Sequence, residues 1–164
     1  MGRVPLSKEE FLKTGPVYSG TLKEALAKYE SAVFSASDQI YMKKFLRHVL
    51  CENSDSAYAD FYYPVLEPDQ KKAFVSGLSD KEKELLTSFE TNTSRVFYRL
   101  DEESMDFLYG ITARNWLFST FYYTNKKLTV WGNYNLQFPV FCEDQCTLEY
   151  YTALARECGL EIGR

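Results

Sequence analysis

The spacing of apolar residues changes along this chain, and the change constrains the fold more than any single motif does. In the first half, apolar side chains recur at helical spacing behind helix-start signatures. From about residue 95, short aromatic and β-branched runs alternate with turn residues, which is typical of strands. The sequence therefore predicts an α+β fold, in which an antiparallel meander of about four to five strands in the C-terminal half is packed by N-terminal helices and a C-terminal helix.

Capping signatures place the expected helices. Three pairs of a Ser or Thr with a Glu three residues later mark expected helix starts, because this spacing lets each side chain cap the other's backbone: Ser7 with Glu10, Thr21 with Glu24, and Ser79 with Glu82. After Thr21, apolar residues at helical spacing extend the second predicted helix to Val33. The polar stretch 51–59 predicts a loop. The last helix is expected to begin near Asp144 and to end at Gly159 in a Schellman motif.

The strands of the second half are expected in four segments: 95–100, 116–123, 128–131 and 136–141. Pro139 has no N–H to donate, which predicts that the last of these strands lies at an edge of the sheet. The chain contains no linker, repeat or low-complexity tract. We therefore expect a single α+β domain that spans residues 1–164.

Composition limits the classes of partner. The net charge of −4 argues against nucleic-acid binding, which relies on a basic surface. No stretch of eighteen residues is apolar throughout, and the first residues lack the pattern of a signal peptide, so no membrane partner is expected. These features predict a cytoplasmic protein whose four cysteines remain reduced.

No group of residues predicts a catalytic or metal centre. His48 is the only histidine, and a general base needs a nucleophile and an orienting group beside it. Cys142 and Cys146 have a spacing that zinc sites use, but Cys158 lies about 18 Å further along the same predicted helix. The sequence also lacks nucleotide-binding loops and the Gly-x-Ser-x-Gly elbow. We expect a protein that is not an enzyme and that binds no cofactor or metal.

The densest aromatic stretch runs from Trp116 to Phe141 and holds nine aromatic residues. Aromatic side chains serve both buried cores and protein interfaces, so a sheet whose two faces are partly buried is the competing interpretation. The binding interpretation assigns central aromatic anchors and an acidic rim to one set of residues: Tyr122, Tyr123, Trp131, Tyr134, Glu143 and Asp144.

These features predict a non-catalytic interaction protein of bacterial type that binds another protein, one of basic character. A concrete form is an immunity-like or antitoxin-like inhibitor of a basic toxin. Two alternatives stay open. One is a small-molecule-binding protein or enzyme with a pocket between sheet and helices. The other is a protein that self-associates through the edge at Pro139. The oligomeric state is not determined by the sequence.

Overall fold

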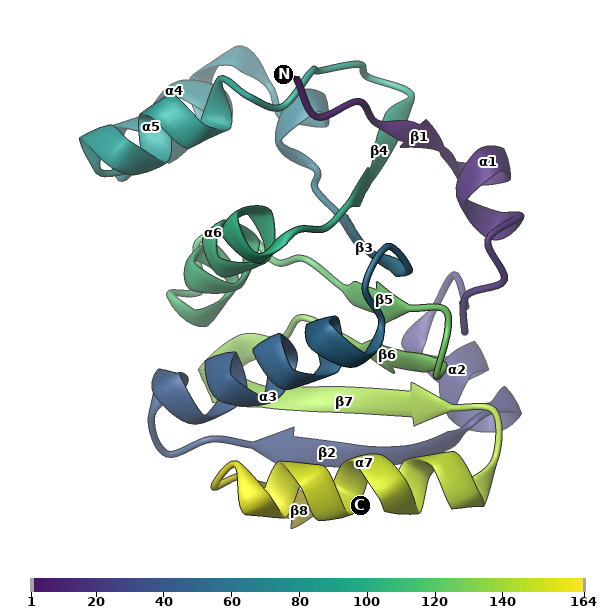
Figure 1. The fold of residues 1–164 in the computed structure, drawn as a ribbon. Helices are drawn as coiled ribbons and strands as arrows, with labels where there is room; N and C mark the ends of the chain where they lie inside the picture. Colours follow the sequence, from purple (N-terminus) through teal and green to yellow (C-terminus); the bar gives the residue numbers. More distant parts are fainter. Residues whose placement is uncertain (1, 164) are drawn as a thin grey trace.

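The computed structural model describes residues 2–163 and shows an antiparallel sheet of eight strands with helices on both faces (Figure 1). The strands lie side by side in the order β1-β4-β3-β5-β6-β7-β2-β8. Their bounds are β1 (Leu6–Ser7), β2 (Glu30–Ser35), β3 (Ala57–Asp60), β4 (Arg95–Arg99), β5 (Phe121–Tyr123), β6 (Leu128–Val130), β7 (Gln137–Cys142) and β8 (Glu161–Gly163). The α+β class is therefore confirmed. The meander is shorter than the four to five strands expected: it consists of β5, β6 and β7, because β3 lies between β4 and β5.

The helices precede, interrupt and follow these strands. The α-helices are α1 (Lys8–Leu12), α2 (Leu22–Lys28), α3 (Gln39–Glu52), α4 (Pro68–Ser76), α5 (Asp80–Leu86), α6 (Glu102–Ala113) and α7 (Gln145–Glu157). Two short 3-10 helices, η1 (Tyr63–Val65) and η2 (Tyr134–Leu136), lie in the connections. Within residues 2–163, none of the helices has both the length and the apolar character that crossing a membrane requires.

The main core lies between one face of the sheet and helices α3, α6 and α7, which cross that face in Figure 1. Strand alternation explains which residues enter it: Ala32 and Phe34 of β2 point into this core, as do Phe138 and Val140 of β7. Residues 61–89, which carry α4 and α5, extend the core at one end through Phe61, Phe74 and Phe89, among others.

The opposite face of the sheet is covered by residues 6–29. Phe11 of α1 stacks on Phe97 of β4, with ring centroids 4.1 Å apart and the rings nearly parallel. Further along, the hydroxyl of Thr129 donates a buried hydrogen bond of 2.5 Å to the carbonyl of Val17. The N-terminal segment is thereby fixed across strands that follow it by about a hundred residues.

The sheet has twice the expected extent because the first half of the chain also supplies strands. The helix predicted to reach Val33 ends at Lys28, and β2 follows directly. Val33 lies four residues after Tyr29, which matches helical spacing, yet Ala32 and Phe34 alternate with Ser31 and Val33 as a strand requires. Six residue pairs with β7 and three with β8 favour the strand, and these partners are distant in sequence.

The prediction that Pro139 marks an edge is wrong. Strand β7 lies between β6 and β2, and Pro139 pairs with Val33. The carbonyl of Pro139 faces β6, where it accepts a hydrogen bond of 2.8 Å from Trp131. In an antiparallel strand, the nitrogen of a residue faces the same side as its carbonyl. The nitrogen of Pro139 therefore also faces β6, so its missing N–H removes no bond to β2. Strand β6 ends at Val130, one residue before the partner of Pro139, and β7 offers no edge for self-association.

Two further boundaries differ from the prediction, and one further strand was not predicted. The expected loop 51–59 contains the end of α3 and most of β3. The expected strand 116–123 is a strand only from Phe121, because residues 114–120 form an irregular connection. Strand β8 follows the Schellman motif at Gly159, where the amide of Leu160 bonds to Ala155 O, at 2.9 Å, as expected.

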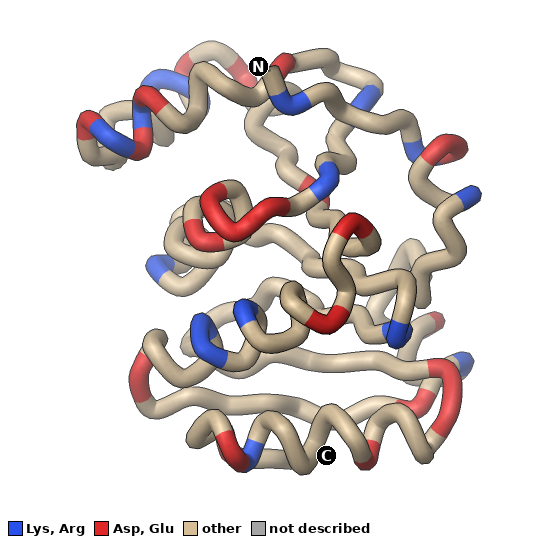
Figure 2. The backbone as a smooth tube through the Cα atoms, in the orientation of Figure 1, with Lys and Arg blue, Asp and Glu red and all other residues tan. Residues whose placement is uncertain are grey.

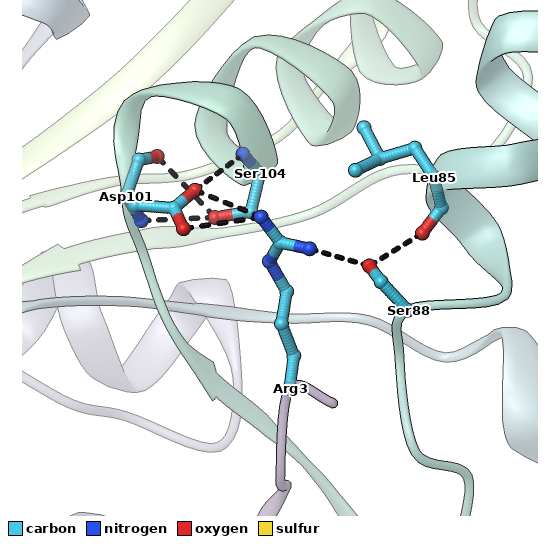
Figure 3. A network of polar contacts seen from close by, with 5 residues as sticks. All are labelled: Arg3, Leu85, Ser88, Asp101 and Ser104. Atoms are coloured by element: carbon cyan, nitrogen blue, oxygen red, sulfur yellow. Dashed lines mark hydrogen bonds and ion pairs between the residues drawn. The ribbon is translucent and has the colours of Figure 1, made fainter. Parts of the chain in front are cut away.

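A polar network fixes the start of the chain to two distant helices (Figure 3). The guanidinium of Arg3 donates to both carboxylate oxygens of Asp101, at 3.0 and 3.2 Å, and to the hydroxyl of Ser88. Asp101 also caps α6 by accepting from the amide of Ser104 at 2.8 Å. Ser88 in turn donates to Leu85 O of α5. Arg3, the end of α5 and the start of α6 are therefore held together at one end of the sheet.

Candidate functional site

The six residues that the sequence predicts to bind a partner lie apart from one another in the structure. Tyr122 and Tyr123 are buried on opposite faces of the sheet. Tyr122 packs edge-on against Phe11 at 4.8 Å, and Tyr123 lies in the main core with its hydroxyl 3.8 Å from the sulfur of Met105. Neither ring is accessible to a partner, so the core interpretation accounts for both.

Trp131 and Tyr134 lie nearer the surface. Trp131 is half-buried and packs on Phe141 of β7, with centroids 6.1 Å apart, in the cluster that α2 covers. Tyr134 is 60% exposed and makes an edge contact of 4.6 Å with Phe118. Of the four aromatic anchors that the sequence indicated, Tyr134 alone presents most of its side chain to solvent.

The two acidic residues have structural partners. Glu143 forms an exposed ion pair of 3.3 Å with Lys127. Asp144 is the N-cap of α7 and accepts a hydrogen bond of 2.7 Å from the amide of Thr147, which lowers the pKa of its carboxyl. Both residues follow the end of β7, whereas Tyr134 precedes its start. Across a strand of six residues, about 20 Å separates these two ends, so the set does not form one surface.

A different surface gathers apolar groups, and we call it the Trp116 groove. It has a volume of about 270 Å³ and is open to solvent. Its walls come from the end of η1, from α4 and from the connection 114–120, and consist of Leu66, Gln70, Ala73, Phe74, Trp116 and Leu117. Gln70 is the single polar member, and its side chain is fixed because its carbonyl accepts a hydrogen bond of 2.9 Å from the amide of Glu67.

Trp116 is both exposed and fixed. Its side chain is 45% exposed, yet its Nε1–H donates a hydrogen bond of 3.1 Å to the carbonyl of Phe74 near the end of α4. The indole also lies on Gly77: a Cβ at this position would come within 2.3 Å of the ring. A glycine after the last residue of α4 therefore makes room for the ring, and the hydrogen bond sets its orientation.

Two connections meet beside Trp116 in left-handed backbone conformations. Asn115 has a φ of 57°, and in η2 Asn135 and Leu136 have φ values of 59° and 56°. Asparagine tolerates this region, whereas a leucine there stores strain of the kind found at binding sites. The side-chain oxygen of Asn115 accepts from the amide of Asn135 at 3.4 Å. This contact, together with that of Tyr134 on Phe118, joins the two connections.

One buried carboxylate lies where the groove walls leave the sheet. Asp60 is the last residue of β3 and is 6% exposed. Its Oδ1 accepts a hydrogen bond of 2.8 Å from the amide of Thr120. Burial raises the pKa of Asp60 to about 7, although this hydrogen bond opposes the shift. Asp60 is thus a buried titratable group on the strand from which one groove wall continues along the chain.

The histidine and cysteines that the sequence analysis examined as catalytic or metal-binding residues lie apart from one another. His48 is exposed on α3, 3.5 Å from a carboxylate oxygen of Glu52. Burial raises the pKa of the Cys142 thiol to about 12, which opposes formation of the reactive thiolate. Cys146 is exposed at the start of α7. In the part of the chain that the structure describes, no three His, Cys, Asp or Glu side chains come together as a metal site would require.

Charged residues collect on the outer side of the helices. Figure 2 shows the acidic start of α6 beside basic positions of α3, and Arg47 pairs with Asp106 across this boundary at 2.5 Å. A hollow of about 370 Å³ lies there, between α3 and α6, and is lined by residues that include Asp38, Lys43 and Tyr109. The space between helices and sheet, where the sequence placed a pocket, is filled by core side chains.

Comparison of the chain with protein families, with characterised proteins and with solved structures found no match.

Sequence reasoning missed the groove because it treated Trp116 as the first residue of a strand. The signal lay in the combination of Asn115 with a tryptophan that is followed by Leu117 and Phe118. Asparagine before an apolar run is a turn signal, and here it separates α6 from the connection. That Leu66 and Phe74 leave an opening beside this tryptophan depends on tertiary packing, which local patterns do not encode.

Proposed function

We propose that this protein is a non-catalytic interaction module that binds another protein by seating an apolar side chain of that partner in the Trp116 groove. The observation that carries the proposal is the tryptophan itself, which is 45% exposed while a hydrogen bond and close packing on Gly77 hold it in place. Tryptophan and tyrosine dominate the binding energy of protein interfaces. A side chain that is already fixed loses little conformational entropy on binding.

The size of the groove favours a protein side chain over a cofactor. Its volume of about 270 Å³ is below the range of roughly 300–1,000 Å³ that is common for small-molecule sites. Its walls are apolar apart from Gln70, so they suit an aliphatic or aromatic anchor. Tyr134, on the connection joined to that of Trp116, supplies a further exposed aromatic group within the same region.

A narrower form of the proposal gives the partner a basic surface. The net charge of −4 supports this choice, because opposite net charges accelerate association. An immunity-like inhibitor of a basic toxin, acting in the cytoplasm of a bacterium, has these properties. The four cysteines are free thiols, as a reducing compartment would keep them.

The test combines site-directed crosslinking with affinity measurement. A photo-crosslinking amino acid placed at Gln70, in the groove, is expected to capture the partner in a lysate of the native host. The same group at Glu149, on α7, is the control, because α4 and α7 lie at opposite ends of the molecule (Figure 1). The captured protein is then purified, and its dissociation constant is measured by calorimetry.

Two matched substitutions decide the result. Ala73→Arg fills the groove from an exposed position of α4, and we expect it to raise the dissociation constant at least tenfold. Ala153→Arg places the same side chain at an exposed position of α7 and should leave affinity unchanged. Equal capture at positions 70 and 149, or equal affinity of the two variants, would refute the groove as the binding site. A captured partner with an acidic surface would refute only the narrower form.

A further inference from the structure

The two chain segments that form the walls of the Trp116 groove join the sheet at Asp60 and Thr120, which lie next to each other. The chain runs forward from Asp60 through η1 to Leu66, and it reaches Thr120 from Trp116 and Leu117. Asp60 and Thr120 are bonded twice: Asp60 N donates to Thr120 O at 3.2 Å, and Thr120 N donates to the Asp60 carboxylate at 2.8 Å. The second bond depends on a titratable side chain.

The surroundings of this carboxylate contain hydroxyl groups and no paired cation. Tyr62 follows it by two residues, on the segment that leads into η1. Strand alternation puts Asp60 on the same face as Tyr58, which pairs with Tyr122 of β5, and the ring of Tyr18 lies 6.1 Å from that of Tyr122.

The basic side chains on this face of the sheet interact with other residues. Arg99 of β4 lies over the ring of Tyr58 at 5.9 Å, and Lys8 of α1 lies over Tyr18 at 5.4 Å. Arg95 of β4 pairs with Glu10. Within residues 2–163, the ion pairs of the protein do not include Asp60. An ionised Asp60 is therefore a buried charge whose compensation comes from hydrogen bonds alone.

We propose that proton binding to Asp60 controls the Trp116 groove: the protonated side chain favours the docked arrangement of residues 61–66 and 115–120, and ionisation favours their separation from each other. The inference rests on the proposed function for its biological role, since it describes the regulation of that binding site. Its structural content, a proton-dependent opening of the two segments, needs no partner.

The direction of the effect follows from linkage. In the docked arrangement, burial raises the pKa of Asp60 to about 7. In an open arrangement, water reaches the carboxylate, and its pKa returns toward the ordinary value of about 3.9. A ligand shifts an equilibrium toward the state that binds it more tightly, and the docked state binds the proton more tightly. Opening should therefore become easier as the pH rises from about 4 to about 7, and then level off.

Hydrogen exchange of single amides tests this inference, and the protein contains its own control. The amide of Thr120 bonds to the buried carboxylate of Asp60, whereas the amide of Thr147 bonds to the exposed carboxylate of Asp144, whose pKa is lowered. After correction for intrinsic exchange, protection of Thr120 should fall by up to about tenfold per pH unit between pH 5 and 7. Protection of Thr147 should stay constant over the same range.

Asp60→Asn removes the titration while it keeps a side-chain oxygen for the amide of Thr120. Protection of Thr120 in this variant should lose its pH dependence between pH 5 and 8. Because the variant can fail to fold, the carboxyl carbon of Asp60 is also titrated by NMR in the unmodified protein. The fluorescence of Trp116, measured in a Trp131→Phe background, should shift with the same midpoint.

Each outcome decides one step. If Thr120 and Thr147 respond alike, or if the Asp60→Asn variant keeps the pH dependence, the proton-dependent opening is refuted. If Thr120 responds and the fluorescence of Trp116 does not, the coupling to the groove is refuted. These readouts use the protein alone, so they are independent of the crosslinking test. If crosslinking at Gln70 fails while they succeed, the opening stands and its role in partner binding is refuted.

Discussion

The indole N–H of Trp116 donates a hydrogen bond of 3.1 Å to the carbonyl oxygen of Phe74, and this bond joins the connection after α6 to the end of α4. The same carbonyl accepts a hydrogen bond of 3.2 Å from the amide of Gly77 at the end of α4, so the indole is its second donor. The bond from the indole fixes a half-exposed aromatic ring at the edge of an apolar groove. One contact thus serves both stability and the geometry of the proposed binding site, and substitutions beside it can separate the two roles.

Gly77→Ala should displace Trp116 without disturbing the backbone. Gly77 has ordinary dihedral angles, with φ −87° and ψ −2°, so alanine fits its conformation. The new Cβ would meet the indole at 2.3 Å, and the ring must move. We expect a red shift of Trp116 fluorescence, weaker partner binding and a loss of about 1–2 kcal/mol in unfolding free energy.

Gly110→Ala is the matched control for that substitution. Gly110 lies inside α6, and a Cβ there meets no atom within 4 Å. Alanine is favoured over glycine in a helix by about 1 kcal/mol, so this variant should be more stable than the original protein by a similar amount. An unchanged indole signal in Gly77→Ala, or a destabilised Gly110→Ala, would show that the packing at these positions differs from the structure.

Replacing a tyrosine between Trp116 and Phe141 should reduce stability in proportion to the burial of its side chain. Tyr123→Ala removes a fully buried ring from the main core and is expected to cost about 3–5 kcal/mol in thermal or urea unfolding. Tyr134→Ala removes a ring that is 60% exposed, and its cost should stay below about 1 kcal/mol. Partner binding should show the reverse order once both variants are compared as folded proteins. Similar losses of stability would contradict the assignment of Tyr134 to the surface.

Local chemistry predicted the helices more closely than the strands. The capping boxes at Ser7 and Ser79 form as expected, because a cap depends on residues three positions apart. The α+β class followed from the change in the spacing of apolar residues, from helical to strand-like, and this spacing is also a property of neighbouring residues. Strand β2 was missed because residues 21–33 fit helical spacing, while the stabilisation of the strand comes from β7, about a hundred residues later.

The candidate site was less accessible to prediction than the fold. The aromatic density between residues 116 and 141 was correctly noticed, but alternation alone does not say which face of a strand is covered. The second face is covered by residues 6–29, so Tyr122 is buried where an open face would have exposed it. The groove depends on contacts between α4 and the connection 114–120, and the carboxylate of Asp60 accepts its hydrogen bond from an amide sixty residues later in the chain.

The network around Arg3 should contribute mainly through the cap that it contains. Asp101→Ala removes both the N-cap of α6 and the partner of Arg3, and we expect a loss of about 1–2 kcal/mol. The ion pair itself should add less than about 1 kcal/mol, because the Asp101 side chain is 61% exposed. A double-mutant cycle with Arg3→Ala measures this coupling, which should decrease as salt is added. A coupling that salt leaves unchanged would contradict the assignment.

The pH dependence of Asp101 has the usual sign for a carboxylate. Burial acts to raise its pKa, but hydrogen bonds from Ser104 and Arg3 outweigh burial and lower it. The stabilisation that Asp101 provides is therefore present above the ordinary pKa of about 3.9 and is lost as the pH falls below it. Glu10, Glu82 and Asp144 also have lowered pKa values, so their contributions change in the same acidic range.

Asp60 should produce the opposite slope, in a range where those carboxylates no longer titrate. Burial raises its folded pKa to about 7, so the folded state holds a proton that the unfolded chain has released above about pH 4. Stability that is present in acid is then lost as the pH rises through 7. The unfolding free energy should fall by up to about 1.4 kcal/mol per pH unit between pH 5 and 7, and should level off above 8.

Urea unfolding at intervals between pH 5 and 8 measures this slope directly. Asp60→Asn carries no titratable group, so its stability should change little over the same range, and it should exceed that of the original protein at pH 8. The exposed substitution Asp55→Asn, in the turn before β3, is the control and should keep the full slope. A flat profile for the original protein, or equal slopes for the two variants, would mean that water reaches the Asp60 carboxylate and that its burial is not maintained in solution.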